Sequence, residues 1–156
     1  MAKPSKMPAF SLPGSDGKTW TGKELKGTPY VLYFYPKDNT PGCTTEACGF
    51  RDNLARVALR GATIFGVSPD SLKSHATFVN KQDLNFVLLA DEEHDLATKL
   101  GVWVEKSMYG RNYMGVERST FLVDAAGVIV HEWRKVKVPG HVDEVLAALE
   151  AHCPAC

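Results

Sequence analysis

Apolar residues along the chain form short continuous runs that alternate with longer segments of helical spacing. The runs Tyr30 to Tyr35, Thr63 to Ser68 and Phe86 to Ala90 have the length and composition of strands buried on both faces. Between them, Thr44 to Leu59 and a segment from Ser71 to about Gln82 have the spacing of helices, with Ser71 as an N-cap. Strands and helices in this order predict parallel strands joined by crossover helices.

Patterns nearer the two ends of the chain predict the remaining elements. Phe10 to Leu12 and Thr19 to Trp20 flank a Pro-Gly-Ser-Asp-Gly turn, which predicts an N-terminal β-hairpin. A short helix is expected over Asp95 to Leu100, and a second hairpin is expected from Thr120 to Val123 and Val128 to Trp133. A last amphipathic helix is expected over Val142 to Ala151. The expected fold class is therefore α/β, a central mixed β-sheet flanked by helices. Residues 1–151 are expected to form one domain, followed by a cysteine-containing C-terminal tail, 152–156.

Charge and composition narrow the classes of function. The chain has 156 residues with 18 basic and 18 acidic side chains, so its formal net charge is zero and no basic cluster predicts nucleic-acid binding. No apolar stretch has the length of a membrane span, and Lys3 and Lys6 are not followed by the apolar run of a secretory signal. We therefore expect a cytoplasmic protein, in which four cysteines indicate chemistry or plain packing more than a disulfide scaffold.

Cys43 stands at the most reactive position of the predicted fold. It follows the buried strand, comes directly after Pro41 and Gly42, and lies at the start of the first long helix. Unpaired backbone N–H groups and the positive end of the helix dipole favour the nucleophilic thiolate there. A free cysteine is often only a small buried side chain. Its place at the carboxyl end of a central strand, where α/β sheets bind ligands, instead favours an activated nucleophile.

Cys48 lies five residues after Cys43 in the same predicted helix. In a regular helix that spacing separates the two Cα atoms by roughly 8.7 Å, beyond the ~7 Å that a disulfide spans. If the two cysteines join during turnover, the first turns of the helix must unwind, so we expect a redox-coupled local unfolding. The alternative is an inert cysteine on the face of a helix.

Three neighbours of Cys43 have expected supporting roles. Thr40 is expected to cap the helix and to place its hydroxyl beside the thiolate. Pro36 ends the strand and stiffens the loop that follows it. Glu46 is expected in the first helical turn, where a carboxylate interacts favourably with the helix dipole, and its role is interpreted as structural.

The motif Pro36-x-x-x-Thr40-x-x-Cys43 resembles the P-x-x-x-[TS]-x-x-C signature of peroxiredoxins. The whole run from Phe34 to Cys48 resembles their Q-type subfamily, also called bacterioferritin comigratory proteins. The similarity extends to about Ala151, through the segments Gly66 to Ser71, Ser74-His75-x-x-Phe78, Leu84 to Phe86, Gly101 to Trp103 and Gly115 to Asp124.

The resemblance implies a thioredoxin-like fold and an atypical two-cysteine thiol peroxidase that reduces hydrogen peroxide and organic hydroperoxides. Cys43 would be the peroxidatic cysteine and Cys48 the resolving one, joined by an intramolecular disulfide. Arg118 matches the active-site arginine of the family. The resemblance also implies a thioredoxin or glutaredoxin-type reductant and no metal, haem or flavin, and it favours a monomer while leaving a dimer open.

The segment His152-Cys153-Pro154-Ala155-Cys156 lies outside the family pattern. Cys153 and Cys156 have the C-x-x-C spacing of a redox dithiol, but no helix follows in the sequence to activate them. Three interpretations stay open. The segment is a terminus without a role, an accessory electron relay to the active-site disulfide, or a metal or intermolecular disulfide site.

Two other functions use the same cysteines. A zinc-binding structural module would need Cys43, Cys48, Cys153 and Cys156, although the four residues between the first two are at the limit of zinc-ligand spacing. A protein thiol oxidoreductase would share the fold and consume no peroxide. The histidines at positions 75, 94, 131 and 141 have no metal-binding spacing and are expected as surface or core residues.

Overall fold

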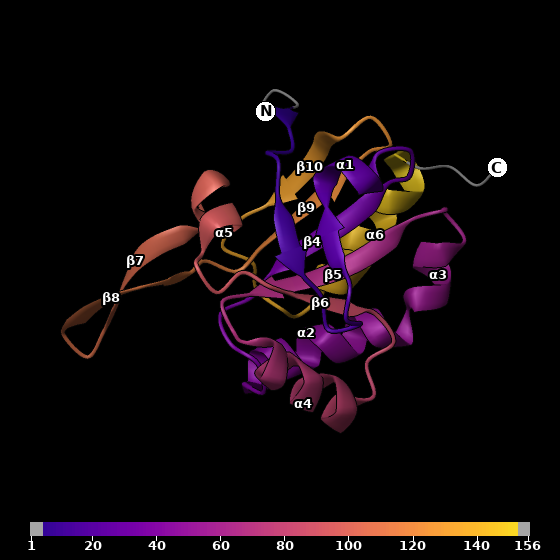
Figure 1. Ribbon diagram of the computed structural model, residues 1–156. Coiled ribbons are helices and arrows are strands. Elements are labelled where there is room, and N and C mark those ends of the chain that lie inside the picture. Colours follow the sequence, from indigo (N-terminus) through magenta and orange to yellow (C-terminus); the bar gives the residue numbers. More distant parts are fainter. Residues whose placement is uncertain (1–4, 153–156) are drawn as a thin grey trace.

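A mixed sheet forms the centre of the computed structural model, which describes residues 5–152 (Figure 1). Its strand order is β1 (Ser5–Lys6), β10 (Val128–Trp133), β9 (Ser119–Val123), β4 (Tyr30–Phe34), β5 (Thr63–Ser68) and β6 (Val87–Ala90). Strands β4, β5 and β6 are parallel, as their alternation with helices predicts. Strands β9, β10 and β1 are added antiparallel, which gives the expected mixed sheet.

The central strand β4 contributes side chains to both layers of the core. Val31, Tyr33 and Tyr35 belong to one apolar cluster, and Leu32 and Phe34 belong to the other, because alternate residues of a strand point to opposite faces. The first cluster is covered by α2 (Pro41–Asp52), α3 (Leu54–Ala58), α4 (Leu72–Gln82) and α6 (His141–His152). The second is covered by α1 (Gly22–Leu25), α5 (Asp95–Lys99) and the hairpin β2 (Ser11–Pro13) with β3 (Thr19–Thr21). Helices therefore lie on both faces of the sheet (Figure 1).

The first long helix differs from the expected one at both ends. It begins at Pro41, three residues before the predicted start, because proline suits the first position of a helix. It ends at Asp52, and α3 follows after Asn53, whose backbone leaves the helical region at φ −114° and ψ 12°. The Asn53 side chain donates to the carbonyl oxygen of Gly49 at 2.8 Å, a local bond of the kind that competes with helix continuation.

Most other predicted elements are confirmed within a residue or two. Ser71 caps α4, its hydroxyl accepting from the Ser74 amide at 3.1 Å. The N-terminal hairpin pairs Ser11 with Thr21. In the last helix the predicted apolar stripe Val145, Leu146 and Leu149 is buried.

One hairpin of the structure was not expected from the sequence. Strands β7 (Trp103–Met108) and β8 (Arg111–Val116) pair only with each other and project from the body of the fold (Figure 1). Tyr109 and Gly110 turn the chain with positive φ angles of 52° and 76°. Apolar and polar residues do not alternate clearly along these strands, because the outer part of the hairpin is exposed on both faces.

Within residues 5–152, no helix has both the length and the apolar character needed to cross a membrane. Cys153 and Cys156, with the interpretations given for them, lie outside the described residues.

Candidate active site

Cys43 lies in the first turn of α2, beyond the carboxyl end of β4. Its side chain is buried, with 1 % of the residue exposed. The amide groups of the first helical turn have no partner within the helix, so they and the helix dipole act on the sulfur atom. The predicted position of the thiol is therefore the observed one, although the helix begins earlier than expected.

Arg118 is the charged group nearest to this sulfur. Its Nη2 donates to the Sγ atom of Cys43 at 3.1 Å, and its Nη1 donates to Glu46 Oε1 at 2.5 Å. The register of the sheet explains the approach, because Phe34 at the end of β4 pairs with Ser119 at the start of β9, directly after Arg118. A side chain at Gly42 would place its Cβ atom 3.3 Å from Arg118 Nη2, so glycine leaves room for the guanidinium.

Glu46 does not have the role expected from the sequence. It lies beyond the first turn of α2, and its side chain is fully buried against Arg118 instead of facing the helix end. Burial raises the pKa of the Glu46 carboxyl to about 7, although Arg118 opposes the shift. The prediction of a dipole contact was wrong because the carboxylate faces inward, toward a partner that is 72 residues away in sequence.

Behind Glu46 lies a second buried polar contact. His141 Nε2 is 2.7 Å from Thr120 Oγ1 and 3.9 Å from the other carboxylate oxygen of Glu46, which has no hydrogen-bond partner among the described residues. Burial, with the nearby charge of Arg118, lowers the pKa of His141 to about 4. Glu46 thus lies between a cation and a neutral imidazole. His141 is a core histidine, as expected.

Thr40 and Pro36 lie in the loop that leads to Cys43. Thr40 is the N-cap residue of α2, but its hydroxyl donates to the carbonyl oxygen of Lys37 at 2.9 Å and makes no bond to a helix amide. The expected side-chain cap is therefore absent, because the hydroxyl is turned back into the loop. Pro36 is half-buried and follows shortly after the end of β4, as expected.

A lysine that sequence reasoning missed interacts electrostatically with the site. Lys106 lies on β7, the unexpected hairpin, and burial together with the charge of Arg118 lowers the pKa of its ammonium group. Lys106 is 63 positions after Cys43 in the sequence, so no local sequence pattern predicts that the two residues come near each other.

Cys48 lies in the same helix as Cys43 and contacts α4. Both thiols are free. The Sγ atom of Cys48 donates to Gln82 Oε1 at 3.6 Å, while Arg51 Nη1 donates to the Gln82 carbonyl oxygen at 2.6 Å. Since both cysteines are in intact α2, helix geometry keeps them beyond disulfide range.

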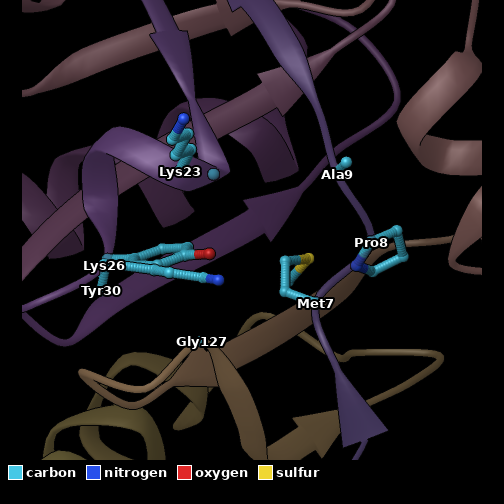
Figure 2. Close-up of a pocket in the computed structure, with 8 residues that line it drawn as sticks. Met7, Pro8, Ala9, Lys23, Lys26, Tyr30 and Gly127 are labelled. Carbon is cyan, nitrogen blue, oxygen red and sulfur yellow. The ribbon is translucent and has the colours of Figure 1, made fainter.

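Two further features lie away from the thiol. Among the described residues, one group of three has metal-binding geometry, namely Asp38, Asp70 and His75. It contains neither cysteine, and Asp38 is hydrogen-bonded to each of the other two residues. A cavity of about 300 Å³ opens between Lys23, Lys26 and the segment from Met7 to Ala9 (Figure 2). Tyr30 at its base starts β4, whereas Cys43 follows the end of that strand, so the cavity lies at the opposite end of the sheet.

Comparisons with known proteins give a consistent result. The AhpC/TSA family matches residues 4–132. Peroxiredoxin Bcp of Bacillus subtilis is 52 % identical over 93 % of this chain and 92 % of its own length. Peroxiredoxin Bcp of Escherichia coli K12 is 43 % identical over 93 % of each chain.

Solved structures agree in fold as well as in sequence. Peroxiredoxin Q of Xanthomonas campestris superposes with a TM-score of 0.89 at 49 % identity, covering 92 % of this chain and 91 % of its own. A structure of the bacterioferritin comigratory protein of the same organism has a TM-score of 0.88 at 48 % identity and covers 92 % of each chain. That work concerns alkyl peroxide reduction, with trapped intermediate and ligand complexes.

Proposed function

The chain belongs to the AhpC/TSA family, with Bcp and Q peroxiredoxins as its relatives, and on this premise we propose that Cys43 is its peroxidatic cysteine. The protein is a thiol peroxidase with a thioredoxin-like fold, which acts on hydroperoxides and is recycled by a thiol reductant. The proposal assigns Cys48 as the resolving cysteine, Arg118 and Thr40 to the stabilisation of the reacting oxygens, and Pro36 and Glu46 to support.

The contact between Arg118 and the sulfur of Cys43 carries this assignment. The partly buried guanidinium lies 3.1 Å from the Cys43 sulfur, where it stabilises negative charge on that sulfur, and it is fixed in place by its second bond, to Glu46. In a site shielded from water, a fixed cation stabilises developing charge on oxygen more strongly than in solution. Arg118 thus serves both the nucleophile and the transition state.

The first step of the proposed reaction oxidises Cys43. Its thiolate attacks one oxygen of the hydroperoxide, the O–O bond breaks, and its electron pair leaves with the second oxygen, which takes a proton to become water or an alcohol. Cys43 is left as a sulfenic acid. Arg118 and the first-turn amides of α2 are the donors available to the two oxygens, and the Thr40 hydroxyl joins them once it turns away from the Lys37 carbonyl oxygen.

The second step joins the two cysteines. The Cys48 thiolate attacks the sulfenic sulfur of Cys43, the S–O bond breaks as the disulfide forms, and the departing hydroxide takes a proton to become water. Because a spacing of five positions in intact helix holds the two sulfurs apart, α2 must first unwind at its N-terminal turns. The same movement breaks the contact between Cys48 and Gln82. An external dithiol then reduces the disulfide and restores both thiols.

The proposal extends to partners and setting. We propose a thioredoxin or glutaredoxin-type reductant, a monomeric enzyme and a cytoplasmic location, where dithiol reductants are maintained. We also propose residues 1–151 as one catalytic domain and 152–156 as a tail. The alkyl peroxide reduction studied in the Xanthomonas campestris relative supports organic hydroperoxides as substrates beside hydrogen peroxide.

Steady-state peroxide consumption tests the two cysteine roles. With thioredoxin as reductant, Cys43→Ser is expected to abolish consumption, because no other residue in the proposal attacks peroxide. Cys48→Ser is expected to consume one equivalent and then to recycle slowly. Insulin reduction without peroxide is the control for a general thiol oxidoreductase. A fully active Cys43→Ser variant contradicts the assignment.

A further inference from the structure

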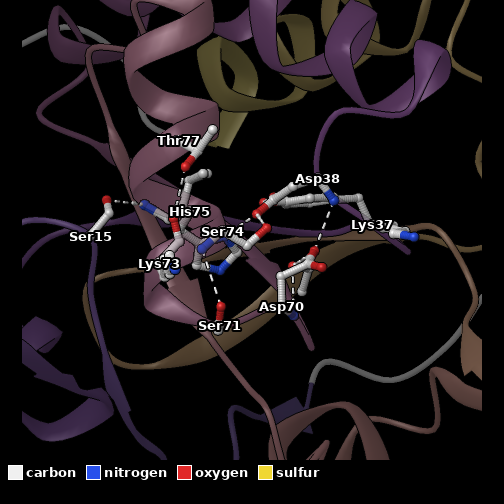
Figure 3. Close-up of polar contacts among 12 residues, drawn as sticks. Ser15, Lys37, Asp38, Asp70, Ser71, Lys73, Ser74, His75 and Thr77 are labelled. Atoms are coloured by element: carbon white, nitrogen blue, oxygen red, sulfur yellow. Dashed lines mark hydrogen bonds and ion pairs between the residues drawn. The ribbon is translucent and has the colours of Figure 1, made fainter.

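A buried polar network holds the loop between β4 and α2, and no step of the reaction described above uses it (Figure 3). Its centre is Asp38, which is 5 % exposed and lies five positions before Cys43. One carboxylate oxygen accepts from the Tyr35 hydroxyl at 2.6 Å. The other accepts from the Ser74 hydroxyl at 2.8 Å and lies 2.7 Å from His75 Nδ1. The carboxylate is therefore fully used inside the protein.

His75 links this carboxylate to the sheet. The ring is completely buried on α4, and its Nε2 lies 2.9 Å from the carbonyl oxygen of Leu89 on β6. A carbonyl oxygen only accepts, so Nε2 must donate. Nδ1 lies 2.7 Å from the Asp38 oxygen that also accepts from Ser74. His75 therefore joins the loop to β6 through its two ring nitrogens.

The backbone of the loop is also held at Asp38. The Asp38 amide donates to Asp70 Oδ2 at 2.8 Å, and the Ser68 hydroxyl holds that oxygen at 2.6 Å. The next residue, Asn39, has a φ of 64°, in the left-handed region where a non-glycine backbone is strained. Strained residues persist only when their surroundings fix them, and the bonds to Asp38 provide that restraint.

We propose that Asp38 and His75 form a positioning pair for the peroxidase reaction. The pair touches neither sulfur nor substrate. It fixes the loop that carries Thr40 and leads into α2, and through it the start of the helix that carries Cys43. The missing side-chain cap at Thr40 makes this restraint necessary, since the helix start has no hydrogen bond of its own to the Thr40 hydroxyl. The inference rests on the proposed role of Cys43.

The pair also sets the upstream limit of the unwinding segment. Downstream, Arg51 is bonded to the end of α4 through Gln82, and Asn85 Nδ2 donates to the Arg51 carbonyl oxygen at 3.2 Å. Upstream, Asp38 is bonded to the start of α4 through Ser74 and His75. Helix α4 therefore clamps both sides of the segment, and only the turns between the clamps are released on oxidation.

Comparing two reactions of the same thiol tests the positioning role. Asp38→Asn and His75→Gln are expected to slow the reaction of Cys43 with hydrogen peroxide by about 30-fold, because small misplacements of reacting groups cost up to about 100-fold. Alkylation of Cys43 by iodoacetamide, followed by peptide mass spectrometry, needs no aligned oxygen donors. It should slow by less than about threefold. Thr77→Ala, on the exposed side of α4, is the matched control and should change neither rate.

Coupling between the two residues is a second readout. If they act as one unit, the double variant should react with peroxide about as slowly as either single variant. Peroxide rates within about threefold of wild type, equal slowing of both reactions, or additive losses in the double variant would each overturn the proposal. In each of these cases an inactive Cys43→Ser protein would still uphold the peroxidase assignment, so the two failures are distinguishable.

Two measurements keep the proposal testable if these variants do not fold. Ser74→Ala removes one of three donors to Asp38 and should slow the peroxide reaction selectively, by about threefold to tenfold. In wild-type protein, ¹⁵N NMR of the His75 ring should show a proton on Nε2, the donor to the Leu89 carbonyl oxygen. An unprotonated Nε2, or an unaltered peroxide rate in a folded Ser74→Ala protein, would overturn the proposal.

Discussion

At the scale of single residues, Arg118 connects the chemistry of the site to its buried interior. One guanidinium nitrogen donates to Cys43 and another to Glu46, so the cation is oriented by a carboxylate that solvent does not reach. Two simultaneous contacts of this kind need the planar fork of donors of a guanidinium, which an ammonium group does not supply. Replacing Arg118 by lysine or by alanine therefore distinguishes the effect of its charge from the effect of its geometry.

Arg118→Ala is expected to lower the second-order rate constant for peroxide by about 100-fold or more, the usual cost of losing a fixed donor to a developing oxyanion. Arg118→Lys keeps the charge but not both contacts, and its loss should be smaller yet clear. Stopped-flow fluorescence of the reduced protein measures both. A rate for Arg118→Ala within about threefold of wild type would remove Arg118 from the site.

Glu46 should impose a pH dependence on stability. Its folded-state pKa is raised from 4.5 to about 7, so the folded protein holds this proton more tightly than the unfolded chain. The stability it contributes is complete below pH 4.5 and is lost as the pH rises through about 7, by roughly 3 kcal/mol. His141, whose pKa is lowered to about 4, acts in the opposite direction between about 4 and 6.5 and masks part of the effect in wild type.

The variant Glu46→Gln isolates the Glu46 contribution, because His141 is present in both proteins. The difference in unfolding free energy, wild type minus variant, should fall between pH 4.5 and about 7. Urea unfolding at a series of pH values measures it. A difference that stays constant over this range would mean that the carboxyl is not perturbed.

The positions of single residues were predictable where the local sequence determines them. Cys43 follows a strand, Pro41 and Gly42, and those neighbours suffice to indicate a thiol at the start of a helix. The roles of Glu46 and Asp38 depend on partners 72 and 37 positions away, and no local pattern signals such contacts. Sequence reasoning therefore placed the Cys43 thiol at the start of the helix, and it missed the buried contacts that Glu46 and Asp38 make around it.

At the scale of elements, the proposed reaction requires α2 to be both a rigid platform and a segment that opens. Its first turns place Cys43, while its last turns are bonded to α4 through Arg51. The break at Asn53 separates α2 from α3, so unwinding of the first helix need not reach the second. The sequence predicted one continuous helix because the spacing of its apolar residues continues across the break.

Oxidation is expected to expose the amides of α2 to exchange. Hydrogen exchange measured by mass spectrometry should rise over residues 44–52 in the disulfide form, since these amides lose their helical bonds when Cys43 and Cys48 meet. Peptides from α3 and α4 serve as internal references and should keep their protection. Equal protection of α2 in the reduced and oxidised proteins would contradict the opening.

Elements with strong local signals were predicted well, and those with weak signals were not. Strand β5 is a continuous apolar run and α4 has a serine cap, so both were placed correctly. The hairpin of β7 and β8 turns at Tyr109-Gly110 instead of the usual Asn-Gly or Asp-Gly, and its outer residues are exposed on both faces. The sequence of this hairpin therefore lacks both a recognisable turn motif and the alternation of apolar and polar residues that predicts a strand.

At the scale of the whole molecule, the packed sheet keeps the two sides of the site in register. Strand β4 leads to Cys43, and its neighbour β9 begins beside Arg118, so any shift between them would separate sulfur from guanidinium. Gly66 lies on the other neighbour, β5, under Tyr33 of β4. A Cβ atom there would lie 2.8 Å from both Tyr33 and Leu88.

Gly66→Ala should destabilise the fold by about 2 kcal/mol, because neither buried neighbour has room to move away from an added methyl group. Gly115→Ala is the matched control. The nearest atom there belongs to the flexible Lys106 side chain, and a change below about 0.5 kcal/mol is expected. Urea midpoints measure both variants. A Gly66→Ala protein as stable as wild type would show that the central sheet is loosely packed.

The central claim, that Cys43 reacts first and Cys48 resolves it, is tested most directly by treating reduced protein with one equivalent of hydrogen peroxide and mapping its peptides by mass spectrometry. The account predicts an intramolecular disulfide between Cys43 and Cys48 in wild type and a sulfenic acid at Cys43 in Cys48→Ser. A Cys43 linked instead to Cys153 or Cys156, or left unoxidised, would contradict it.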